Sequence, residues 1–127
     1  MVKYRLIESE TVELKKSTSE LKEAMISIVS ILNKTGKGQL YFGVKNDGTL
    51  VGQDVTENTL REISKSISDH IEPKTYPKIN KIDLNDKNCV LVDFEGLEKP
   101  YFAYGRAYVR VSDEDKQLSA KELENII

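Results

Sequence analysis

The loop Thr35-Gly-Lys-Gly38, with Lys34 just before it, has the residue types that contact phosphate groups. Its glycines let the backbone bend and present N–H groups, while Lys34 and Lys37 add positive charge. The loop does not fit the nucleotide-binding pattern G-x-x-x-x-G-K-S/T, and it ends a predicted helix instead of starting one. We therefore expect no ATP site. Two interpretations remain open: a loop that contacts nucleic-acid phosphates, or a glycine helix stop with its lysines in solvent.

Acidic residues near the N-terminus suggest a second kind of chemistry. Glu13 and Lys15 lie two residues apart in an alternating segment, so their side chains share one face of a strand. Metal-dependent nucleases use such a pair: the carboxylate binds Mg²⁺ or Mn²⁺, and the lysine steadies the scissile phosphate. Glu8 and Asp47 are the other candidate metal ligands. The alternative is an ion pair on an exposed strand face.

Arg106, Tyr108 and Arg110 alternate along a third candidate strand and should also share a face. Two guanidinium groups around an aromatic ring suit phosphate contacts and base stacking. The alternative is a solvent-facing strand whose long side chains cover the ring.

The hydrophobic pattern predicts two main helices that position these residues. Apolar residues at helical spacing predict a helix over residues 18–33 that stops at Gly36, and another that begins after Thr56 and that Pro73 ends. A short helix should begin at Ser119. Because this helix starts so near the last residue, we expect residues 1–127 to be one domain of a longer protein.

Alternating residues and turn signals predict strands around these helices. The extended segments should be 11–15, 40–44, 78–84, 89–94, 101–103 and 107–111. The Asn46-Asp-Gly48 turn predicts a return strand at residues 50–51. The fold class that follows is α+β, with a mixed, largely antiparallel sheet, two main helices and a short C-terminal helix.

Composition limits the function classes. The formal net charge of −2 excludes a protein coated in basic residues, so a nucleic-acid surface must be a local patch. A single cysteine excludes an internal disulfide, and one cysteine with one histidine argue against a zinc site. No apolar run is long enough to cross a membrane. We expect a cytoplasmic protein with no membrane contact, no cofactor and no small-molecule substrate.

In their order along the chain, these motifs resemble the Schlafen/AlbA-type domain, also called the divergent AAA N-terminal domain. The resemblance covers nearly the whole chain, and the matching segments are Glu8 to Glu13-Leu-Lys15, Asn33 to Gly38, Leu40 to Val44, Asn46-Asp-Gly48, Gly52, Lys99-Pro-Tyr101 and Tyr108-Val-Arg-Val111. It implies a compact α/β domain that forms the N-terminal part of a longer bacterial or archaeal protein. Such domains are expected to bind DNA or RNA in transcriptional regulators and helicase-related proteins.

The resemblance also implies a possible catalytic set. Related domains of animal Schlafens form an RNA endonuclease with three acidic residues, two of which correspond to Glu8 and Glu13. The third position is Asn46 here, and an amide is a poorer metal ligand than a carboxylate. This departure favours holding phosphates over cutting them.

Our first hypothesis is a non-enzymatic nucleic-acid-binding domain of a transcriptional regulator, with DNA the expected partner and a homodimer the expected form. The proposed contacts are Lys15, Lys34, Lys37, Lys45, Arg106, Tyr108 and Arg110. The second is a Schlafen-like endoribonuclease that uses Mg²⁺ or Mn²⁺, with Glu8, Glu13, Asp47 and Lys15. The third is an assembly module that docks a neighbouring domain through a sheet edge or the final helix.

Overall fold

Two small sheets and three α-helices make up the computed structural model, which describes residues 6–126. The first sheet has the order β1-β2-β5-β4, and the second has the order β3-β6-β7-β8. The elements are β1 (Val12–Lys15), the 3-10 helix η1 (Thr18–Glu20), α1 (Leu21–Lys34), β2 (Lys37–Phe42), α2 (Glu57–His70), β3 (Ile71–Glu72), β4 (Lys78–Leu84), β5 (Lys87–Glu95), β6 (Phe102–Ala103), β7 (Arg106–Val111), β8 (Glu114–Gln117) and α3 (Ala120–Ile126). Only β1 and β2 pair in parallel. The predicted α+β class is confirmed, although the strands form two sheets instead of one.

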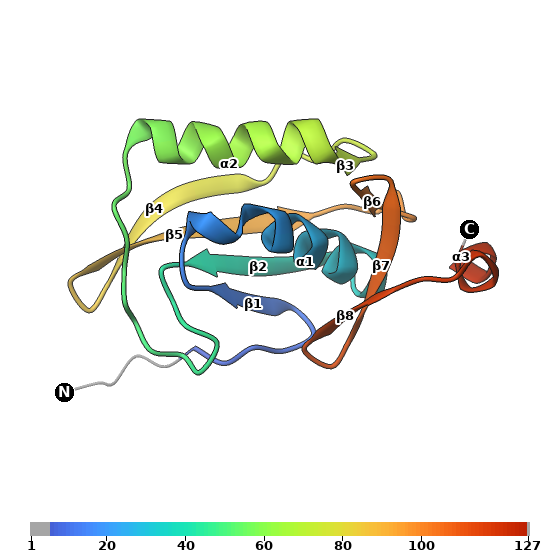
Figure 1. Cartoon of the computed structure of the whole chain (residues 1–127), viewed down its shortest axis with the longest axis horizontal. Helices are drawn as coiled ribbons and strands as arrows, with labels where there is room; N and C mark the ends of the chain where they lie inside the picture. Colours follow the sequence, from blue (N-terminus) through green and yellow to red (C-terminus); the bar gives the residue numbers. More distant parts are fainter. Residues whose placement is uncertain (1–5, 127) are drawn as a thin grey trace.

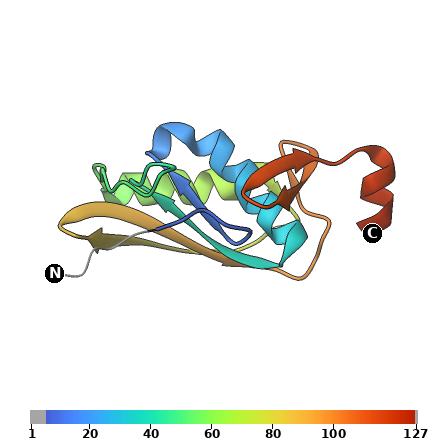
Figure 2. The ribbon, with the colours of Figure 1, turned by 90° about the horizontal axis from the view of Figure 1, so that it is seen from below.

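The two long helices lie on the same side of the first sheet (Figures 1 and 2). The main core fills the space between them and the inner faces of β2 and β5, with residues such as Ile28, Leu40 and Val92 fully buried. The second sheet packs through β7 against the other side of α1. Because α1 is covered on two sides, it also buries polar residues, namely Ser27, Ser30 and Asn33.

Local signals explain where the helices begin and end. The Ser17 side chain accepts a hydrogen bond from the Ser19 backbone at the start of η1, and α1 follows directly. Thr56 and Thr59 form a reciprocal capping box on α2. The C-terminus of α1 is closed by backbone bonds from Thr35 and Gly36 to the last turn, with Gly36 at a φ of +81°. All three positions agree with the sequence pattern.

The predicted strands are confirmed where residues that favour a tight turn connect them. Asn85 and Asp86, both at positive φ, turn β4 into β5, and Tyr104-Gly105 does the same between β6 and β7. The predicted return strand after Asn46-Asp-Gly48 is reduced to one bridge between Val44 and Leu50.

The final helix stands apart from the body of the domain. Figure 1 shows α3 beyond the end of the two sheets. Ser119 and Glu122 form a reciprocal cap at its start, yet α3 contains no buried residue. None of the helices within residues 6–126 is long and apolar enough to cross a membrane.

Candidate functional site

The predicted exposed face of β1 is turned inwards. Glu13 pairs with Leu40 and Lys15 with Phe42, and both partners belong to the core beneath α1. The Glu13 side chain is therefore only 6% exposed, and that of Lys15 14%. The two charged atoms stand 3.9 Å apart. The expectation of an accessible surface pair is wrong. The alternating sequence predicts that Glu13 and Lys15 share a face of the strand, but it does not predict which elements cover that face.

Arg110 is the main partner of Glu13. Its Nη1 donates to Glu13 Oε1 at 2.8 Å and to Asp115 Oδ1 at 2.7 Å. Its Nε and Nη2 donate to the backbone oxygens of Ser9 and Val12 at 3.0–3.1 Å. The side chain is 0% exposed, so its donors all serve the protein interior. The expectation that Arg110 contacts phosphate from an exposed strand face is wrong.

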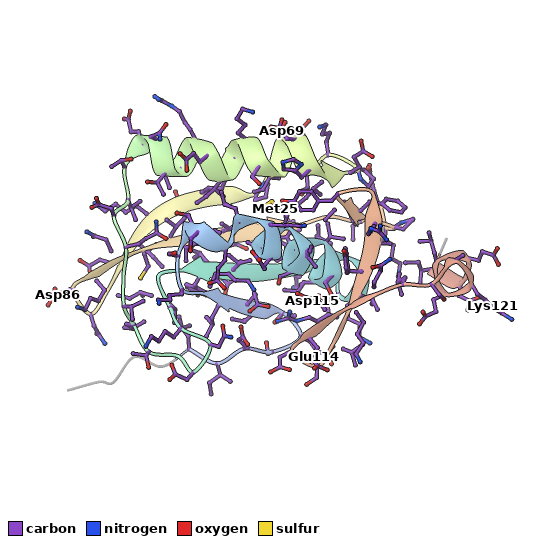
Figure 3. All side chains as sticks on the ribbon, viewed as in Figure 1. Met25, Asp69, Asp86, Glu114, Asp115 and Lys121 are labelled. Carbon is purple, nitrogen blue, oxygen red and sulfur yellow. The ribbon has the colours of Figure 1, made fainter. Side chains whose placement is uncertain are left out.

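Ser27 of α1 completes this group, which we call the acidic cluster: Glu8, Glu13, Ser27, Arg110 and Asp115. The Ser27 hydroxyl lies 3.1 Å from Glu13 Oε1 and 2.6 Å from Asp115 Oδ2. Asp115, labelled in Figure 3, reaches from β8 towards α1. Sequence reasoning missed both residues. The only signal was a serine among the apolar residues of the α1 stripe.

Glu8 and Glu13 are linked through the same backbone group. The Leu14 N–H lies 3.2 Å from Glu8 Oε2 and 3.0 Å from Glu13 Oε2. Burial, followed by the hydrogen bond and charge of Glu13, raises the pKa of Glu8 from 4.5 to about 8. Burial also pushes the pKa of Glu13 upwards, but hydrogen bonds from Glu8 and Arg110 outweigh it and hold that pKa below 4.5. The pair therefore holds one proton near neutral pH.

Asp47 does not join these carboxylates. Its Oδ1 accepts from the Thr49 backbone N–H at 2.9 Å, which closes the turn, and this bonding lowers its pKa. Across the described residues, no three His, Cys, Asp or Glu side chains are placed to hold a metal ion. Glu13 already receives bonds from Ser27, Arg110 and Leu14. The candidate set Glu8, Glu13 and Asp47 does not fit a Mg²⁺ or Mn²⁺ site in this arrangement.

The glycine loop after α1 is a packed helix stop. A Cβ on Gly38 would lie 2.6 Å from both Ile31 Cγ2 and the Thr11 carbonyl oxygen. The N–H groups of Thr35 and Gly36 are taken by α1 carbonyls. The helix-stop interpretation therefore explains the glycines, and the loop's contribution to phosphate contact must come from its lysines.

Lys37 borders a hollow, which we call the lysine groove. The hollow measures about 710 Å³ and is lined by Thr35, Gly36, Lys37, Lys74, Thr75, Tyr76, Glu95, Gly96, Leu97, Glu98 and Tyr101. A smaller adjoining hollow of about 150 Å³ shares Gly36, Gly96 and Leu97, and adds Lys34 and Lys99. The structure thus brings together Lys34 and Lys37 and adds lysines from two distant segments.

Asn33 fixes the rim of the groove. Its amide accepts from the Tyr101 backbone N–H at 2.7 Å and donates to the Tyr101 carbonyl at 2.9 Å. The same amide nitrogen donates to the Tyr108 carbonyl at 2.7 Å. Two motifs that are 68 residues apart in sequence, Asn33 and Lys99-Pro-Tyr101, therefore meet for a structural reason.

The remaining predicted contacts are dispersed. Lys45 is exposed and lines a separate hollow with Lys16, Asn46 and Asp47. Arg106 is exposed at the start of β7, whereas Tyr108 is partly buried against the main core. The expected Arg106–Tyr108–Arg110 face therefore turns towards α1 after its first residue.

Known structures share this fold. The protein DIP2311 from Corynebacterium diphtheriae superimposes with a TM-score of 0.72 at 13% identity, over 92% of this chain and 23% of its own length. A second structure superimposes with a TM-score of 0.61. It is the N-terminal domain of a protein from Nitrosomonas europaea that is provisionally named as an ATP-dependent DNA helicase RecG-related protein. Its identity is 20%, over 90% of this chain and 86% of that one. The chain spans less than a quarter of the length of the first of these proteins.

Sequence comparison gives the family. No curated protein matches the chain. The family model described as Schlafen, AlbA_2 matches residues 8–119, a range that contains the acidic cluster, the glycine loop and the strands β1 to β8. The chain belongs to the Schlafen AlbA_2 family.

Proposed function

We propose that this domain binds nucleic acid, with DNA the expected partner, and does not cleave it. The observation that carries the proposal is the gathering of Lys34, Lys37, Lys74 and Lys99 around the lysine groove. Family membership and the fold shared with a domain named for a DNA helicase support the same class of partner.

Within the part of the chain that the structure describes, the groove lysines have no carboxylate in a salt bridge with them, although the Lys74 ammonium also donates to the Ser68 carbonyl. All four are exposed. The salt bridges among residues 6–126 involve Lys15, Arg61, Lys65 and Arg110, and none of the groove lysines. Flexible ammonium groups free of carboxylate partners bind phosphates without regard to base sequence.

The acidic cluster supports binding over hydrolysis. Its two ionised carboxylates, Glu13 and Asp115, share Arg110 as their cation, Lys15 lies 3.9 Å from Glu13, and Glu8 retains its proton near neutral pH. Such a cluster stabilises the fold and leaves no open coordination position for a metal-bound water.

A charge-reversal comparison tests this proposal. The variant Lys34→Glu/Lys37→Glu should lose most binding to labelled DNA in fluorescence anisotropy at low salt. The control Lys81→Glu/Lys87→Glu changes the charge equally, but at the far end of β4 and β5, and should keep it. Absence of binding by the unmodified protein, or equal losses in both variants, would contradict the proposal.

We further propose that the domain serves a transcriptional regulator as a homodimer. One groove offers few phosphate contacts on a protein of net charge −2, and a second copy doubles them. Light scattering after size exclusion, with and without duplex DNA, measures the mass directly. A monomer under both conditions would refute the dimer.

A further inference from the structure

We infer that the lysine groove binds a single nucleic-acid strand, with a base stacked on Tyr76. This inference rests on the proposed function and names the form of nucleic acid that the groove selects. It follows from the exposure of Tyr76, the way its loop is held, and the mixture of charges around it.

Tyr76 presents an aromatic ring to solvent at the centre of the groove region. Its side chain is 88% exposed, the largest exposure of any aromatic residue among the exposed large hydrophobic residues. It lines the main hollow and two adjoining ones, of about 280 and 210 Å³, so these hollows meet at the ring. Water-exposed apolar surface of this kind adds little to folding and is available for stacking.

The loop that carries Tyr76 is anchored on both sides. The Thr75 hydroxyl donates to the Glu95 carbonyl of β5 at 3.3 Å, and the Lys74 ammonium donates to the Ser68 carbonyl of α2. Pro77 follows the tyrosine and restricts the backbone before β4 begins. The backbone that carries the ring is therefore anchored, which lowers the entropy lost when a base stacks on it.

Positive charge surrounds the ring. Lys37, Lys74 and Lys78 line hollows that also contain Tyr76, and Lys34 and Lys99 line the adjoining hollow. Phosphates spaced along a strand can contact these ammonium groups while a base reaches the ring. This combination of a basic track and an aromatic platform is how proteins bind single strands without sequence choice.

The acidic and apolar residues of the groove fit a single strand better than a duplex. Asp93, Glu95 and Glu98 interrupt the lysines, which disfavours a surface laid against two phosphate backbones. Carboxylates can instead accept hydrogen bonds from exposed base amino groups. Leu97, 96% exposed at the same hollow, adds apolar contact for a base. In a duplex the faces of the bases are already stacked, so Tyr76 would gain nothing.

Fluorescence anisotropy on the full chain tests the inference with a labelled 12-nucleotide DNA strand and the duplex of the same sequence. We expect tighter binding of the strand. Tyr76→Ala should weaken strand binding about tenfold, within the range of about 5- to 150-fold that removal of a stacking residue produces, and leave duplex binding unchanged. Tyr76→Phe keeps the ring and should bind like the original protein.

The outcomes separate this inference from the proposed function. Equal affinity for strand and duplex, or strand binding that Tyr76→Ala leaves unchanged, would overturn the inference and assign the ring to another partner such as a protein. Failure to bind either DNA would overturn the proposed function itself. A circular-dichroism melt of Tyr76→Ala should match the original protein, because the side chain is almost fully exposed.

Discussion

Glu8 and Glu13 show how the surroundings of a residue decide its chemistry. Their types and spacing suit a metal site, yet Glu13 binds Arg110 and Ser27. Glu8 stays protonated beside the ionised Glu13. Two carboxylates this close cannot both ionise cheaply, so one stays neutral. Their role in this fold is to join β1 to the rest of the protein.

The Glu8 proton predicts how stability depends on pH. The folded-state pKa of Glu8, about 8, lies above its ordinary value of 4.5. Its contribution is therefore complete below about pH 4.5 and is lost as pH rises through 8. Glu13, whose pKa is lowered, acts oppositely: its contribution is present above 4.5 and lost as pH falls. We expect thermal melts to show stability declining from about pH 5 to pH 9.

The variant Glu8→Gln isolates this effect. A glutamine resembles the protonated carboxyl and does not titrate, so the decline at high pH should flatten. Glu10→Gln alters a nearby exposed glutamate and should leave the profile as it was. An unchanged decline in Glu8→Gln would disprove the shared proton.

Arg110→Ala should destabilise the domain by about 3–5 kcal/mol. The substitution removes the cation of Asp115 and leaves Glu13 with only Lys15, 3.9 Å away, and breaking a buried pair carries a cost of that size. Arg106→Ala, at an exposed position of the same strand, should change stability by less than about 0.5 kcal/mol. Urea unfolding measures both. If Arg110→Ala weakened DNA binding and left stability unaltered, Arg110 would be a DNA-contact residue after all.

At the scale of elements, the glycine after α1 is needed for packing. Gly38→Ala would force a Cβ to 2.6 Å from Ile31 and from the Thr11 carbonyl, so α1, β2 and the segment before β1 must separate. We expect a loss of about 1–3 kcal/mol in urea unfolding. Gly105→Ala, where nothing lies within 4 Å of the new Cβ, provides the comparison and tests positive φ alone. A Gly38→Ala variant as stable as the original protein would contradict this packing argument.

Sequence predicted the elements whose signals are local. The helix starts near residue 18 and after Thr56, and the turn between β4 and β5, depend on neighbouring residues, so pattern alone located them. The strand β8, with the polar sequence Glu-Asp-Lys-Gln, shows no alternation and was missed. The burial of Glu13 was also out of reach, because it depends on Ser27 and Asp115, which lie far along the chain. The sequence did not point to Tyr76 either, because the exposure of a single ring depends on how the rest of the chain packs around it.

At the scale of the whole molecule, the binding surface is a patch on a protein of net charge −2. About four or five lysines near the groove can displace counterions from a strand. Each contact to a single strand contributes about −0.7 to the slope of log affinity against log salt, so we expect a slope of about −3.

Anisotropy titrations from 25 to 200 mM salt, as a rough working range, would give that slope. Lys34→Glu/Lys37→Glu should reduce its magnitude by at least about 1.4, because two contacts are removed. Lys116→Glu/Lys121→Glu, on β8 and α3, should not alter it. A slope near zero in the original protein would mean that phosphate contact is not the basis of binding.

The bonds of Arg110 have a consequence for how the chain is made. They join residues 101, 98 and 97 positions apart, and the Ser27–Asp115 bond spans 88. During synthesis, β1 and α1 leave the ribosome long before Arg110 and Asp115 exist, so Glu13 at first has only Lys15 as a neighbouring cation. The domain should complete its folding only after residue 115 has emerged, in one late cooperative step dominated by long-range contacts. A nascent chain stopped before Arg110 should therefore be sensitive to protease, whereas one extended past Gln117 should resist it.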